Sequence, residues 1–159
     1  MKYAHNVYWA KNPVQDTIDN NLEALEFDLV YRMLDGKIYC SHSYRPLPCM
    51  YYGKLEKYLS EISEVKEKIK YVILEPKTFN PFLMKPLYEL LYRYKKVMPN
   101  VIYVMSVQYK HWVTLQPLRE LWLKIFFKRY KEELDIKDKR LQTDLNEQVD
   151  LFEKKWYHF

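Results

Sequence analysis

The sequence predicts an α/β protein with a largely parallel sheet, and three observations support this prediction. Short runs rich in β-branched and aromatic residues alternate with amphipathic helical stretches, which is the pattern of βαβ units. The chain has 159 residues, enough for one compact domain and too few for two ordinary ones. Apolar residues make up 48% and charged residues 30%, the balance of a globular protein. We therefore expect a single domain over residues 1–159.

Five segments are expected to form strands, because each is short and rich in β-branched or aromatic residues. They are 2–8, 25–31, 37–41, 71–75 and 100–107. In the second of these, apolar side chains flank two carboxylates, which predicts a buried strand.

Four segments are expected to form helices. Over 52–70 and 80–98, apolar side chains recur at helical spacing. Beyond residue 107, the segments 116–134 and 140–156 also have helical periodicity, and no further strand is expected. The β/α alternation thus covers 1–110, and 111–159 is expected to be a helical C-terminal extension.

Composition excludes several classes of protein. The chain has two glycines, too few for a glycine-rich phosphate-binding loop. Its two cysteines are too few for a disulfide framework and lack metal-ligand spacing. No apolar run is long enough for a transmembrane segment, and the first residues lack the apolar core of a signal peptide. We therefore expect a cytoplasmic protein.

The net charge of +5 suits a protein that meets anions, such as a phosphorylated small molecule, a lipid head group or nucleic acid. A nucleic-acid-binding module is the weaker hypothesis, because most of the 16 tyrosines fall in strands or on helical stripes, where they fill core space. A nucleic-acid partner is therefore not expected.

Two carboxylates mark the candidate site. Glu26 and Asp28 lie two apart in an expected strand, so their side chains leave the same face about 7 Å apart. Their apolar neighbours predict burial, and a buried carboxylate pair is costly without a cation or strong donors. Oxygen ligands suit a hard divalent cation, Mg²⁺ or Ca²⁺. Taken alone, such a pair is more often on the surface.

Further polar residues lie at the ends of the expected strands. Asp35-Gly36 predicts a tight turn, after which the chain returns with His42. Glu75 and Lys77 close a later strand, where they could also form a plain salt bridge. His5 lies near the end of the first strand. Active sites of parallel barrels form at the carboxyl ends of strands, so these residues would converge on one rim.

The order His5, Glu26-x-Asp28, Asp35-Gly36, His42, Glu75-x-Lys77 resembles the glycerophosphodiester phosphodiesterases and the related sphingomyelinase-D-like phospholipases, members of the phospholipase-C-like phosphodiesterase superfamily. The resemblance covers roughly residues 2–110. It implies a truncated (β/α) TIM barrel of about four to five strands with amphipathic helices. Because the later barrel strands have no counterpart, either a homodimer completes the barrel or the fold is an open half.

The resemblance also implies roles for individual residues. His5 and His42 are the expected general acid and base, and Glu26, Asp28 and Glu75 the ligands of one divalent cation, Mg²⁺ or Ca²⁺. Lys77 and Asn6 are the expected substrate-binding residues, with Asn6 standing where many members of the family have arginine.

Two functions follow from these roles. The first is a metal-dependent phosphodiester hydrolase or lyase that acts on glycerophosphodiesters or lysophospholipids by two-histidine acid/base catalysis. The second is a catalytically inactive relative that binds a phosphorylated ligand or a protein partner.

Overall fold

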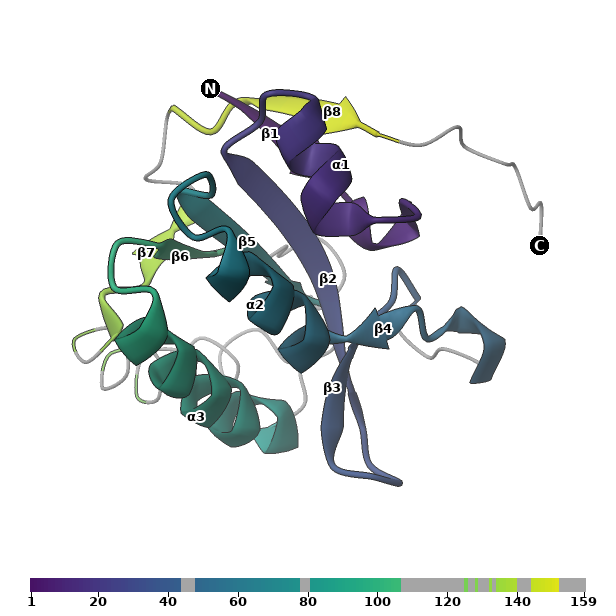
Figure 1. Cartoon of the computed structure of the whole chain (residues 1–159). Coiled ribbons are helices and arrows are strands. Elements are labelled where there is room, and N and C mark those ends of the chain that lie inside the picture. The colour runs from purple at the N-terminus through teal and green to yellow at the C-terminus, as the bar shows by residue number, and fades with distance from the viewer. Residues whose placement is uncertain are drawn as a thin grey trace.

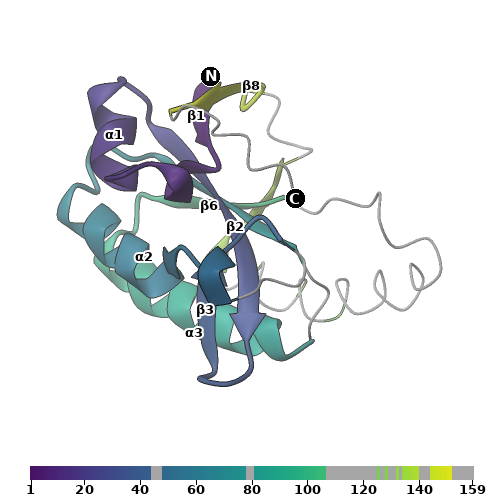
Figure 2. The ribbon, with the colours of Figure 1, turned by 90° about the vertical axis from the view of Figure 1, so that its right-hand side faces the viewer.

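A computed structural model of the chain shows, in the residues it describes, one mixed sheet with three helices on one of its faces (Figures 1 and 2). The structure describes residues 1–43, 48–77, 81–106, 134–139 and 144–151, together with positions 125, 128 and 132. In this described part, no helix is long and apolar enough to span a membrane.

The sheet contains eight strands. They are β1 (Lys2–His5), β2 (Ala24–Arg32), β3 (Lys37–Cys40), β4 (Gly53–Lys54), β5 (Tyr71–Pro76), β6 (Ile102–Met105), β7 (Lys137–Asp138) and β8 (Glu147–Asp150). The helices are α1 (Pro13–Asp19), α2 (Leu55–Glu64) and α3 (Pro81–Val97), and 3₁₀ turns lie at Val7–Trp9 and Pro48–Met50.

Six of the strands are parallel and lie in the order β8-β1-β2-β5-β6-β7. The last strand thus lies beside the first, which is the adjacency of a parallel barrel. No pairing joins β7 to β8 in the described part of the chain, so the barrel is not closed. β3 runs antiparallel to the second half of β2 and forms a hairpin with it, and β4 pairs antiparallel with β3.

The main hydrophobic core lies between the sheet and the helices. Strand side chains that alternate along β2 and β5 meet the apolar stripes of α2 and α3, and Phe27 stacks on Tyr58 with ring centroids 5.0 Å apart. The contributing side chains include Leu25, Leu29, Val72, Leu74, Leu55, Leu59, Ile62, Leu83, Leu87 and Leu91. The apolar side chains that recur at helical spacing in the sequence are thus the ones that cover this face of the sheet.

The other face of the sheet holds a small apolar cluster and, beyond it, charged side chains. The cluster consists of Tyr3, Ala24, Tyr71, Ile73, Val104 and Leu145. Lys139, which follows β7, contacts Glu26 on β2 although two strands lie between them in the sheet. The sheet is therefore curled around this face.

The strands expected at 25–31, 37–41, 71–75 and 100–107 are present with shifted ends, and the strand expected at 2–8 ends at His5. The helices expected at 52–70 and 80–98 are α2 and α3.

The helix expected over 140–156 is wrong at Glu147–Asp150, which form the strand β8. Leu145 and Val149 are four apart, as in a helix, but pairing with the open edge of β1 makes Glu147–Asp150 a strand. The estimate of four to five strands is too low for the same reason, because β7 and β8 are short and depend on their partners. Most of the helix expected over 116–134 lies outside the described residues.

Helix α1 was not expected either. Its sequence signal is Pro13 at the first helical position, a common place for proline.

Candidate active site

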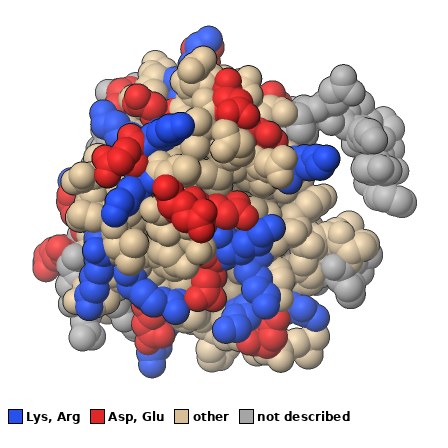
Figure 3. All heavy atoms as spheres, in the orientation of Figure 1, with Lys and Arg blue, Asp and Glu red and all other residues tan. Residues whose placement is uncertain are grey.

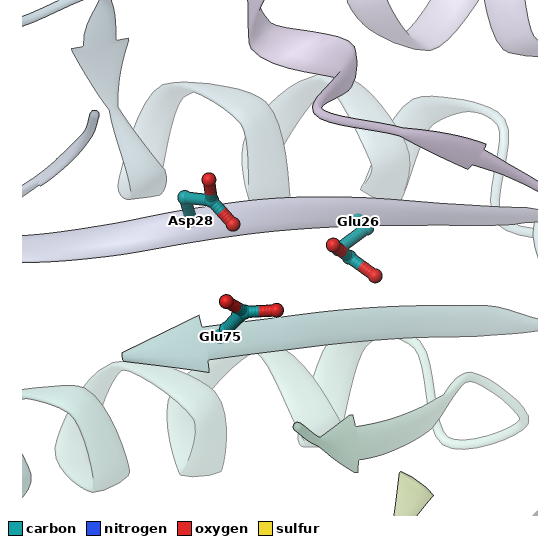
Figure 4. Close-up of side chains that lie close together, drawn as sticks. All are labelled: Glu26, Asp28 and Glu75. Atoms are coloured by element: carbon teal, nitrogen blue, oxygen red, sulfur yellow. The ribbon is translucent and has the colours of Figure 1, made fainter. Parts of the chain in front are cut away.

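Three buried carboxylates lie together on the curled face of the sheet. Glu26 and Asp28 come from β2 and Glu75 from β5, where Asp28 and Glu75 are register partners. The three side chains are 1%, 0% and 3% exposed. Each offers an oxygen within 4.8 Å of the others, and Figure 4 shows the three side chains close together, Glu26 and Asp28 on β2 and Glu75 on the neighbouring β5. The spacing of two along β2 therefore places Glu26 and Asp28 on one face, as the sequence predicted, and the register of β5 brings Glu75 beside Asp28.

The partners of Asp28 test whether this cluster fits a cation. Its Oδ2 atom accepts a hydrogen bond from the Tyr8 hydroxyl at 2.7 Å, and it lies 2.8 Å from His42 Nδ1 and 3.1 Å from Lys77 Nζ. Its Oδ1 atom is buried and, in the described structure, has no hydrogen-bond partner. A buried carboxylate oxygen without a partner is costly. An oxygen-rich cluster with one unsatisfied ligand atom fits one hard divalent cation.

Two lysines also contact the cluster. Lys77 forms ion pairs with Glu75 and Asp28. Lys139 lies 2.8 Å from Glu26 Oε2 and donates a hydrogen bond to the Tyr3 hydroxyl at 2.8 Å. With three carboxylates and two ammonium groups, the formal charge of the cluster is −1 when all five are ionised, so a cation is still favoured there.

Burial controls the ionisation of these groups. Burial raises the pKa of the Glu26 carboxyl, Glu75 raises it further, and Lys139 opposes both. For Lys77 and Lys139, burial lowers the pKa, but the neighbouring carboxylates outweigh it and the net pKa is raised. Both lysines are therefore charged at neutral pH.

Both expected catalytic histidines reach this cluster, and each has an aspartate at Nδ1. His5, at the end of β1, lies 2.9 Å from Asp150 Oδ1 through Nδ1 and 3.7 Å from Glu26 Oε1 through Nε2. His42, just after β3, lies 2.8 Å from Asp28 Oδ2 through Nδ1, and its side chain is 57% exposed. These contacts orient both rings. Nε2 of His5 faces Glu26, whereas the exposed His42 ring can offer its Nε2 to another molecule.

Asn6, expected to bind substrate, is buried in the left-handed region with φ 49°, a conformation that asparagine tolerates. Its amide oxygen lies 3.3 Å from the Tyr8 hydroxyl, which also contacts Asp28. Burial, and then Asp28, raise the pKa of the Tyr8 phenol far above its usual range, so Tyr8 remains a hydrogen-bond donor. Asn6 is thus linked to the carboxylate of Asp28 through the Tyr8 hydroxyl.

An aromatic wall stands beside His42. The Trp9 ring lies 5.5 Å from the His42 ring, and Tyr8 and Tyr52 contact each other with centroids 5.5 Å apart. Trp9 and Tyr52 also pack together, at 6.1 Å. These rings were not expected at the site, since no spacing in the sequence relates them to His42.

No protein-family model matches this sequence, and no curated protein matches it. Among solved structures, the chain is similar to a crystal structure from Silicibacter pomeroyi DSS-3 of a protein provisionally assigned as a glycerophosphoryl diester phosphodiesterase. The match has a TM-score of 0.56 and 12% identity, and it covers 94% of this chain. The likeness is one of fold. The chain spans 63% of the length of that protein.

The fold expectation is therefore correct at a coarse level. The chain is a mixed α/β protein with a fold similar to that of the Silicibacter pomeroyi protein, and its described strands do not close into a barrel.

Two residues of the cluster were missed by sequence reasoning. Lys139 and Asp150 contact Glu26 and His5, from which they are separated by 113 and 145 residues. Both belong to the region expected to be helical. An expected strand ending at either residue would have been the signal, and neither strand was expected.

Proposed function

We propose that the chain is a metal-dependent phosphodiester hydrolase or lyase of the glycerophosphodiester phosphodiesterase type. The observation that carries this proposal is the unsatisfied Oδ1 of Asp28 inside a buried three-carboxylate cluster flanked by two histidines. Glycerophosphodiesters or lysophospholipids are the proposed substrates. The fold likeness supports the proposal only in its general class.

Glu26, Asp28 and Glu75 would hold one divalent cation, Mg²⁺ or Ca²⁺. When bound, that cation would neutralise charge on the phosphodiester oxygens. Lys77 is the proposed second source of positive charge, because its ammonium group already lies among the carboxylates. Asn6 would act through Tyr8, which it contacts, rather than at the surface.

His5 and His42 would move the protons. One imidazole Nε2 removes the proton from a water molecule, or from the substrate hydroxyl, as that oxygen forms a bond to phosphorus. The other Nε2 gives a proton to the leaving alkoxide as the second P–O bond breaks. Asp150 and Asp28 contact the rings at Nδ1 and so orient each imidazole.

A second function has a specific observation in its favour. Lys77 and Lys139 already pair with all three carboxylates in the structure. These built-in cations could stabilise the cluster without a metal, and the chain would then bind a phosphorylated ligand without turning it over. Metal binding separates the two proposals, because the second requires none.

The direct test is hydrolysis of glycerophosphocholine and lysophosphatidylcholine with Mg²⁺ or Ca²⁺. We expect activity that EDTA removes, and a loss of about 10²–10⁴-fold in His5→Ala and in His42→Ala. Circular dichroism of each variant checks folding. Activity insensitive to EDTA and to both substitutions would overturn the proposed site, and no activity on either substrate would favour the binding protein.

We also propose one domain over 1–159, in which a second copy could complete the barrel. A solution mass equal to one chain would exclude the homodimer.

A further inference from the structure

The hairpin between β2 and β3 carries two large apolar side chains at its tip. Met33 is 70% and Leu34 88% exposed, the two highest values among large hydrophobic residues in the described part of the chain. Single exposed apolar residues are ordinary, but an adjacent pair on a projecting turn is not. Figures 1 and 2 both show this hairpin extending beyond the body of the sheet.

Polar side chains hold the hairpin in shape. The Arg32 guanidinium lies over the rings of Tyr39 and Tyr51, 5.7 and 5.5 Å from their centroids. Asp35 accepts a hydrogen bond from the Tyr39 hydroxyl at 2.7 Å and lies 3.6 Å from Arg32. The turn is therefore built by its polar residues, and its apolar pair is presented to the outside.

The hairpin projects from the same end of the sheet as the candidate site. β2 runs from Asp28 to the tip, and β3 returns from it to His42. At a strand rise of about 3.3 Å per residue, Leu34 lies at most roughly 20 Å beyond Asp28. Phe82, 62% exposed, is in the first turn of α3, which begins where β5 has ended. Exposed apolar groups thus gather at the end where the site lies.

Positive charge accompanies the apolar tip. Lys37 follows the turn, and Lys54 lies over the ring of Tyr39, 6.0 Å from its centroid. Both lysines are exposed. Figure 3, in the orientation of Figure 1, shows Lys and Arg interspersed with Asp and Glu over this face of the molecule. An apolar tip with cationic neighbours is complementary to a lipid surface that carries anionic head groups.

We propose that the Met33–Leu34 tip, together with Phe82, inserts into the surface of a phospholipid layer containing anionic lipids, with Lys37 and Lys54 against the head groups. The hairpin then directs the end of the sheet that carries Asp28 and His42 toward the lipid. This inference goes beyond the proposed function, and lipid binding can be measured whether or not the site turns over.

The test is co-sedimentation of the full chain with vesicles of phosphatidylcholine and phosphatidylglycerol. The double variant Met33→Ser/Leu34→Ser should partition on the order of tenfold to a hundredfold more weakly, because two apolar side chains lose their burial. The matched control is Tyr92→Ser/Val97→Ser, which removes two exposed apolar groups farther along α3. This control should bind as the wild type does.

The cationic part has its own variant. Lys37→Gln/Lys54→Gln should weaken binding severalfold to anionic vesicles and leave binding to pure phosphatidylcholine vesicles unchanged.

Three outcomes would overturn the inference. One is wild-type protein that does not sediment with anionic vesicles. Another is an equal loss in the tip variant and the Tyr92/Val97 control, which would mean that the tip is not special. The third is a dimer in solution that Met33→Ser/Leu34→Ser dissociates, since a second copy would then be the occupant. Failure of the proposed function looks different, because His42→Ala and the wild type would both bind vesicles while neither hydrolyses glycerophosphocholine.

Discussion

The curled face of the sheet has two regions, to which the same strands contribute. The apolar floor is the cluster Tyr3, Ala24, Tyr71, Ile73, Val104 and Leu145. The charged rim is the group Glu26, Asp28, Glu75, Lys77 and Lys139. Along β2 the residues on this face are Ala24, Glu26 and Asp28, and along β5 they include Ile73 and Glu75. The floor residues pack against one another, whereas the rim residues on these two strands are carboxylates that are equally buried. Residues two apart on the same strand thus share a face, yet one packs in the apolar floor and the next is a carboxylate of the rim.

The two regions contribute differently to stability. Each floor side chain is removed from water without losing a hydrogen bond, so its burial stabilises the fold. Burying a charge costs free energy that an ion pair only partly returns. A rim that keeps three carboxylates and two ammonium groups out of water is therefore better explained by function than by stability.

Among the proposed substitutions, Asp28→Asn in the rim should have the largest effect, and that effect should be on activity. The amide keeps the shape of the side chain but removes a proposed cation ligand and the negative charge that His42 Nδ1 contacts. We expect kcat/KM for the proposed phosphodiester hydrolysis to fall about 10³-fold, roughly 4 kcal/mol of transition-state stabilisation. The matched control is Asp19→Asn on the exposed surface of α1, with unchanged kcat/KM. A loss of only a few-fold in Asp28→Asn would remove Asp28 from the site.

Ile73→Ala in the floor should lower the stability of the fold. Ile73 is fully buried in the apolar cluster, and the truncation leaves a cavity there. We expect the free energy of unfolding, measured in urea, to fall by about 3 kcal/mol. Ile125→Ala, the same substitution at a 58% exposed position, should change it by less than about 0.5 kcal/mol. Equal effects at the two positions would show that the floor does not stabilise the fold.

The two regions also differ in how far the sequence predicted them. The carboxylates could be placed because strands have a period of two, and the spacing of Glu26 with Asp28 fixes a shared face. The order of the motifs then predicted that Glu75 and both histidines belong to the same end of the sheet. The first prediction depended on a local pattern, and the second on the expected parallel sheet, whose strand ends lie together.

The parts that could not be predicted depend on long-range pairing. β7 has two residues and β8 four, and their strand form comes from the edges of β6 and β1 that they meet. Helical spacing in the same segment suggested the opposite. Lys139 and Asp150 follow or end these strands, so their positions could not be inferred before the strands were known.

A divalent cation should stabilise the rim and leave the floor as it is. With Mg²⁺ or Ca²⁺ at about 100 times its dissociation constant, we expect unfolding to become harder by roughly 2.7 kcal/mol, seen as a higher midpoint temperature. In Ile73→Ala, the cation should raise the free energy of unfolding by the same amount, although the variant is less stable than the wild type without it. In Glu75→Gln, the cation should give little of this stabilisation. No shift with either ion in the wild type would favour the alternative in which Lys77 and Lys139 replace the metal.

Lys139→Met should lower the free energy of unfolding, because it removes one of the two ammonium groups that pair with the rim carboxylates. Glu26 would lose its 2.8 Å partner while its carboxylate stays buried. Lys139 is itself 20% exposed, so we place the loss between a surface pair and a fully buried one, about 2 kcal/mol near neutral pH. Lys57→Met, at an exposed i,i+4 pair with Glu61, is the matched control and should lose less than about 0.5 kcal/mol.

The pH dependence of that loss identifies Glu26 as its cause. The folded-state pKa of Glu26 is raised above 4.5, so ionising it destabilises the fold as pH rises through that pKa, and removing Lys139 raises the pKa further. Lys139 has a pKa raised above 10.5, so its own contribution is present below 10.5 and lost above it. The stability gap between wild type and Lys139→Met, from urea unfolding across pH, should therefore be small below 4.5, widest near neutrality and small again at strongly alkaline pH. A gap that does not vary with pH would mean that Lys139 acts by packing on Tyr3 and not by its charge.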